Sequence, residues 1–92
     1  MHTDEYEISL ARELKHCEQV VRTTKEALAT WHQRFGMDYA AASAAVAAGR
    51  LQLDGQELAA WREDIEALPV WEQRLVDYRE AFSVMRISAS RF

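Results

Sequence analysis

Apolar side chains recur along the first third of the chain at alternating intervals of four and three residues. The spacing holds for more than three heptads, with one polar interruption at Thr24, and is typical of a helix that presents an apolar seam to a neighbour. It predicts a helix over residues 4–35, ended by Gly36. The seam residues expected to support self-association are Leu10, Leu14, Cys17, Val21, Leu28, Trp31 and Phe35.

Two shorter helices are predicted next, each with its own start signal. Asp38 can cap a short, alanine-rich helix over residues 39–48. Asp54 and Glu57 have the spacing of a capping box, which predicts a helix over residues 55–68.

Pro69 interrupts the apolar pattern that follows the capping box. Proline cannot donate a backbone hydrogen bond and clashes with the preceding turn, so a break or sharp kink is expected there. A fourth helix is predicted over residues 69–86, followed by a loose tail over residues 87–92. The pattern leaves open whether the helices on either side of the proline form one kinked helix.

Together these elements predict an all-α fold. The long N-terminal helix would pack against two or three shorter helices as a helical bundle, in a single domain over residues 1–92. A chain of 92 residues builds a small core, and chains of this size often add a second subunit. We therefore expect a dimer, although the pattern does not fix its stoichiometry or helix orientation.

Charge and composition narrow the function classes. The chain has 11 basic and 15 acidic residues and a net charge of −4, which argues against a nucleic-acid-coating protein. No apolar run approaches the ~20 residues of a membrane span. The acidic N-terminus has no signal-peptide pattern, and the single cysteine, Cys17, suits a reducing compartment, so a cytoplasmic location is expected.

Residues that could carry chemistry do not form a recognisable set. Glu13 and His16 make one Glu-x-x-His element, but the second copy that a di-iron bundle needs is missing from the sequence. The three histidines are scattered, and there is no glycine-rich phosphate loop. We expect no enzymatic activity, metal or cofactor. A small metal-dependent helical enzyme is the remote alternative to the protein-binding hypotheses given below.

Aromatic residues near the C-terminus suggest a binding surface. Most of the aromatic residues are expected in the core, but tryptophan and tyrosine are also favoured anchors at interfaces. Trp71 is the leading anchor candidate, because it follows Pro69 and falls off the register of the preceding helix. The candidate partner-binding residues are Trp71, Tyr78, Phe82, Met85, Arg86 and Arg91.

Residues 31–75 resemble a group of small helical bacterial proteins that are encoded beside toxins and act as their antitoxins. The shared outline is Gly36-Met37, the cap Asp38, a second glycine before an apolar residue (Gly49-Arg50-Leu51), an acid-led cap and Trp61. The resemblance implies that the chain neutralises a partner, such as a small basic toxin, by steric occlusion. The alternative hypothesis is a structural homodimer that acts as a scaffold.

Overall fold

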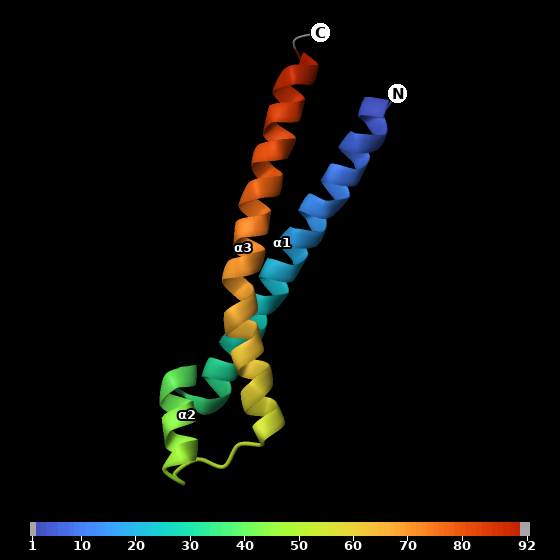
Figure 1. Ribbon diagram of the computed structural model, residues 1–92. Coiled ribbons are helices and arrows are strands. Elements are labelled where there is room, and N and C mark those ends of the chain that lie inside the picture. The colour runs from blue at the N-terminus through green and yellow to red at the C-terminus, as the bar shows by residue number, and fades with distance from the viewer. Residues whose placement is uncertain (1, 91–92) are drawn as a thin grey trace. The chain divides into compact units, whose positions relative to one another are not determined.

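The computed structural model describes the backbone of residues 2–90 and the side chains of residues 5–85. Three α-helices make up this described part: α1 (His2–Phe35), α2 (Tyr39–Ala47) and α3 (Gly55–Ser90) (Figure 1). The all-α class and the long first helix are confirmed. Dimerisation stays a prediction.

α3 corrects the expected helix boundary at Pro69. The helix continues through the proline, and it also runs through residues 87–90, which the sequence pattern assigned to a loose tail. A proline inside a helix costs about 3 kcal/mol. Packing of apolar residues on both sides of it, such as Trp61 and Leu75, offsets that cost. Residues 91 and 92 lie outside the described part.

The chain divides into two compact units. Unit 1 combines Met1–Arg22 with Val70–Phe92, and unit 2 is Thr23–Pro69. Each unit therefore takes one part of α1 and one part of α3, and α2 belongs to unit 2. That the two units form a single domain stays a prediction from the sequence.

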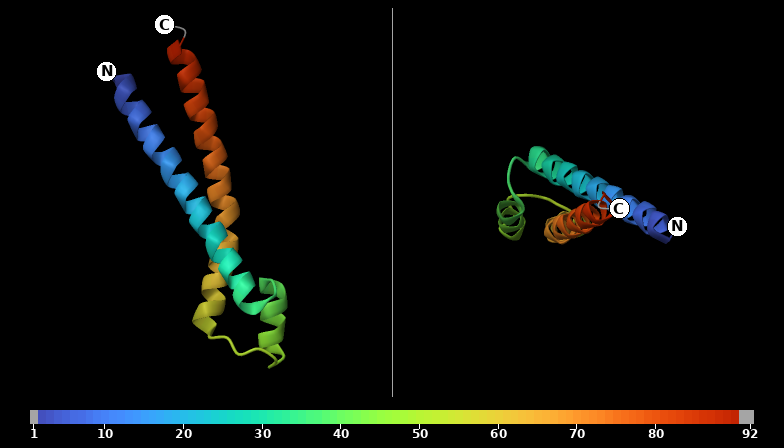
Figure 2. Two further views of the ribbon diagram at one scale, coloured as in Figure 1. Left: turned by 180° about the vertical axis from the view of Figure 1, so that it is seen from behind. Right: turned by 90° about the horizontal axis from the view of Figure 1, so that it is seen from above.

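Unit 1 is an antiparallel pair of helical segments (Figures 1 and 2). Its buried side chains come from both helices: Leu10, Cys17 and Val21 from α1, and Leu75 from α3. These few buried side chains make a small core. Its contribution to stability is limited, because a fully buried leucine contributes only about 1.5–3 kcal/mol.

Unit 2 places α2 beside the end of α1 and the start of α3. Asp38 caps α2 as predicted, because its carboxylate accepts a hydrogen bond from the Ala41 backbone N–H at 2.8 Å. Gly49 follows α2 with φ of 74°, a left-handed conformation that glycine adopts without strain. Ala42 and Ala45 are buried, so the alanine-rich sequence lets α2 pack at close range.

Candidate protein-binding surface

A group of stacked aromatic rings forms the centre of unit 2. Trp61 is 2% exposed, and its ring lies 5.6 Å from both Trp31 and Phe35, in nearly parallel planes. Tyr39, the first residue of α2, meets the Trp61 ring edge-on at 5.8 Å. The rings therefore link all three helices of this unit, and such pairs add about 0.5–1.5 kcal/mol each beyond area burial.

Polar contacts fasten the end of α1 to the start of α3. The Trp31 indole Nε1 donates a hydrogen bond to Asp64 Oδ2 at 3.2 Å. Arg34 donates from both terminal nitrogens to the two Glu57 carboxylate oxygens, at 3.2 and 3.4 Å. The Arg34 guanidinium also lies 4.8 Å from the centre of the Phe35 ring. This bidentate pairing gives the first turns of α3 a defined position against α1 within unit 2.

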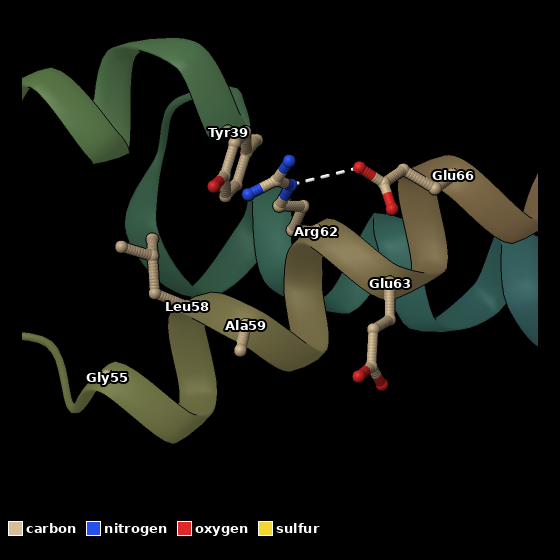
Figure 3. A pocket seen from close by; sticks show the side chains of 7 residues that line it. All are labelled: Tyr39, Gly55, Leu58, Ala59, Arg62, Glu63 and Glu66. Carbon is tan, nitrogen blue, oxygen red and sulfur yellow. Dashed lines mark hydrogen bonds and ion pairs between the residues drawn. The ribbon is translucent and has the colours of Figure 1, made fainter.

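One hollow opens on the surface of this unit, with a volume of about 400 Å³. We call it the α3 hollow. Residues of α3 that share one helical face supply most of its wall, and Tyr39 of α2 supplies the rest (Figure 3). The lining residues are Tyr39, Gly55, Leu58, Ala59, Arg62, Glu63 and Glu66.

The charges around the α3 hollow are unequally paired. Arg62 Nε donates to Glu66 Oε1 at 2.9 Å, and this hydrogen bond, with the charge of Glu66 and a smaller effect of Tyr39, raises the pKa of the arginine above its usual range. Glu63 is exposed and has no hydrogen bond or ion pair among the described side chains. Figure 3 shows its carboxylate pointing away from the Arg62–Glu66 pair.

This arrangement can receive a long cationic side chain. Leu58, Ala59 and the Tyr39 ring offer apolar surface for the methylene stem of a lysine or arginine. The unpaired carboxylate of Glu63 can accept hydrogen bonds from the charged head. Arg62 is already neutralised by Glu66, so it opposes an incoming cation weakly.

The predicted self-association seam packs within the chain. Leu10, Cys17 and Val21 are buried in unit 1, where Leu14 is half-buried. The remaining members lie in unit 2, and all are half-buried: Leu28, Trp31 and Phe35.

The predicted partner-binding residues all belong to unit 1, whereas the residues of the α3 hollow belong to unit 2. Trp71 is half-buried, with His16 edge-on at 5.5 Å between ring centres and the Arg74 guanidinium 4.6 Å over its ring. Tyr78, Phe82 and Met85 are half-buried as well. The Arg86 side chain and the whole of Arg91 lie outside the described part. Their role in partner binding stays a prediction.

The sequence pattern did not single out Tyr39, Arg62, Glu63 and Glu66 as one site. The i,i+4 spacing of Arg62 and Glu66 predicts a salt bridge on one helical face. The hollow itself depends on where α2 places Tyr39, which no local spacing encodes.

Neither a metal-binding cluster nor a membrane-spanning helix occurs in the described part of the chain. No group of three or more His, Cys, Asp or Glu side chains that could hold a metal ion occurs among the described residues. None of the helices, as far as they are described, is long and apolar enough to cross a membrane.

Comparisons with protein-family models, with curated proteins and with solved structures found no match to this chain.

Proposed function

We propose that this chain is a protein-binding module that docks a basic segment of a partner protein in the α3 hollow and neutralises the partner by covering its surface. The role is that of an antitoxin-like protein, and the partner is a small basic protein. The observation that carries the proposal is the unpaired Glu63 carboxylate at the rim of a hollow with apolar walls.

The charge of unit 2 supports a basic partner. Residues 23–69 contain seven acidic and four basic side chains, so most of the chain's net charge of −4 lies in this unit. Three of the carboxylates pair with side chains of the unit: Glu57 with Arg34, Asp64 with Trp31 and Glu66 with Arg62. Asp38 and Asp54 accept hydrogen bonds from backbone N–H groups at the starts of α2 and α3. Complementary charge of this kind speeds association and selects the partner.

The resemblance described above favours the same surface. The residues that carry it lie in unit 2 and include the Asp38 cap, Asp54 and Glu57 at the start of α3, and Trp61. These residues hold α2 and the start of α3 in the arrangement that forms the hollow. A partner-neutralising role would therefore use a surface that is held in place by the residues that carry the resemblance.

The experiment compares capture of a partner by three forms of the chain. The tagged wild-type protein and two variants, Glu63→Lys and Glu26→Lys, are used as bait in lysate of the native host, and the eluted proteins are identified by mass. Glu26→Lys changes the net charge equally but lies on α1, outside the hollow. We expect one small basic protein in fixed ratio with the wild type and the control.

Binding measurements on the purified complex then decide the proposal. Glu63→Lys should weaken the complex by more than ~tenfold, because like charges opposed at an interface cost several kcal/mol. The control should bind as the wild type does. Equal binding by all three forms, or an acidic partner, would refute the α3 hollow as the docking site.

A further inference from the structure

A second stripe of residues runs along α3 in unit 1, at spacings of four, three, four and three. We call it the outer stripe: Val70, Arg74, Asp77, Ala81 and Val84. Its spacing is that of a helix-packing seam, yet all five residues are exposed, with Val70 at 50% and Val84 at 63%. It is distinct from the neighbouring face of α3 that carries the buried Leu75.

The two charged residues of the outer stripe make no ion pair among the described side chains. The Arg74 guanidinium lies over the Trp71 ring, and Asp77 Oδ1 accepts a hydrogen bond from Gln73 Nε2 at 3.0 Å. Arg34, Arg62 and Arg79, in contrast, each pair with a carboxylate. Arg74 and Asp77 are thus held in position by uncharged neighbours, with their charges open to a partner.

A hollow of about 370 Å³ lies beside the middle of the stripe. Its lining includes three stripe residues, with the small side chain of Ala81 among them. Tyr6 of α1, which is 59% exposed, forms part of the opposite wall. Such a recess beside a small residue is the kind of hole that accepts an apolar side chain from a facing helix.

The first four residues of the outer stripe, from Val70 to Ala81, are complementary to their own reverse order. When two copies of α3 lie antiparallel, with the two-fold axis between Leu75 and Val76, Arg74 of each copy faces Asp77 of the other. In the same register, Val70 of each copy faces Ala81 of the other and can enter the recess there. Two-fold interfaces require this kind of self-complementary patch.

We propose that the outer stripe binds a second copy of this chain, with the two α3 helices antiparallel and Arg74 of each copy paired with Asp77 of the other. Two helix pairs joined in this way form a four-helix arrangement in which each helix pair keeps its own core. This interface differs from the α1 seam, whose residues pack within the chain, and it is independent of the α3 hollow.

Charge exchange tests the proposed register. Arg74→Glu alone places two acids opposite each other, and Asp77→Arg alone places two arginines opposite each other. The double variant Arg74→Glu with Asp77→Arg restores opposite charges across the axis. Mass in solution, measured by sedimentation, should give a dimer for the wild type, monomers for both single variants and a dimer again for the double variant. Circular dichroism checks that each variant keeps its helices.

Each other outcome counts against the proposal. A monomeric wild type at concentrations of about 100 µM would overturn it, since standard interfaces bind far more tightly than that. Dimeric single variants would place the interface elsewhere. A folded double variant that stays monomeric would reject the Arg74–Asp77 register. Val70→Lys, at a 50% exposed position that faces Ala81 of the other copy, should weaken the dimer more than ~tenfold, whereas Val76→Lys, at a 45% exposed position off the stripe, should leave it unchanged.

A cross-link tests the same register without altering charge. Val70 and Ala81 are 11 residues apart on one helix, about 16 Å, which is too far for a disulfide within one chain. In a Cys17→Ala background, Val70→Cys mixed with Ala81→Cys should form a covalent dimer on mild oxidation, and neither variant alone should do so. Cross-linking of each variant with itself, in place of the mixture, would overturn the antiparallel pairing.

Discussion

The indole nitrogen of Trp31 donates a hydrogen bond to Asp64 Oδ2 at 3.2 Å, joining α1 to α3 inside unit 2. The contact is partly buried, and the Trp31 ring also stacks on Trp61. One side chain thus contributes both a charge-assisted hydrogen bond and an aromatic contact. Asp64 thereby fixes the orientation of the indole at the edge of the aromatic group.

A double-mutant cycle measures this hydrogen bond. Trp31→Phe keeps an aromatic ring but removes the donor, and Asp64→Ala removes the acceptor. The coupling between the two changes should be about 1–2 kcal/mol, the range of a hydrogen bond to a charged group that is partly open to water. Urea unfolding of the four proteins gives the value. A coupling near zero would show that the bond adds nothing to stability.

Trp61 is the side chain whose loss should most affect unit 2. Trp61→Ala removes a ring that is 2% exposed and contacts Trp31, Phe35 and Tyr39. The expected loss of unfolding free energy is about 3–5 kcal/mol, as for other buried aromatic residues. The matched control is Ile65→Ala on the same helix, where the side chain is 38% exposed and the loss should stay below about 1 kcal/mol. Comparable losses from the two variants would contradict this account of the core.

Pro69, inside α3, should lower the stability of the protein. Pro69→Ala restores a backbone donor and removes the clash with the preceding turn, so the protein should gain about 1–3 kcal/mol of stability. Thermal and urea unfolding measure the gain. A loss of stability would mean that the native backbone at this position suits proline better than alanine.

Local signals in the sequence predicted the starts of α2 and α3. Asp38 caps α2, and Asp54 accepts a hydrogen bond from the Gln56 backbone N–H at the start of α3, because capping depends on a few neighbouring residues. The helix boundary predicted at Pro69 was wrong, because local signals alone do not decide the structure there. The local cost of the proline is fixed, but packing of the helix on both sides of it decides the outcome, and that packing involves α1 residues distant in sequence.

The candidate site was less predictable than the helices. The 4–3 spacing of α1 correctly indicated a packing seam, but spacing alone does not say whether the seam meets another part of the same chain or a second copy. The α3 hollow combines Tyr39 of α2 with Arg62 and Glu63 of α3. Such a site exists only after the helices pack, so no single segment carries its signature.

Cys17 provides a prediction for alkaline pH. The thiol is 1% exposed in the core of unit 1, and this burial, with a smaller effect of the Glu13 charge, raises its pKa above the usual range; Arg74 partly opposes the shift. In the unfolded chain the thiol ionises near pH 8.5. Below that pH the thiol is protonated in both states, and it does not change the stability with pH. Above it the unfolded state loses its proton first, so stability falls as pH rises through the folded-state pKa.

The comparison variant is Cys17→Ala, which keeps every other group that ionises at alkaline pH. Unfolding free energies of the two proteins, measured by urea at intervals from pH 7 to about pH 10.5, should differ by a constant below pH 8.5 and then converge as the wild type loses its advantage. Reaction of the folded wild type with a thiol reagent should also be slow at pH 8, because buried thiols are protonated and inaccessible. A constant difference across the whole range, with rapid labelling, would show that water reaches the thiol and that the core of unit 1 is open at Cys17.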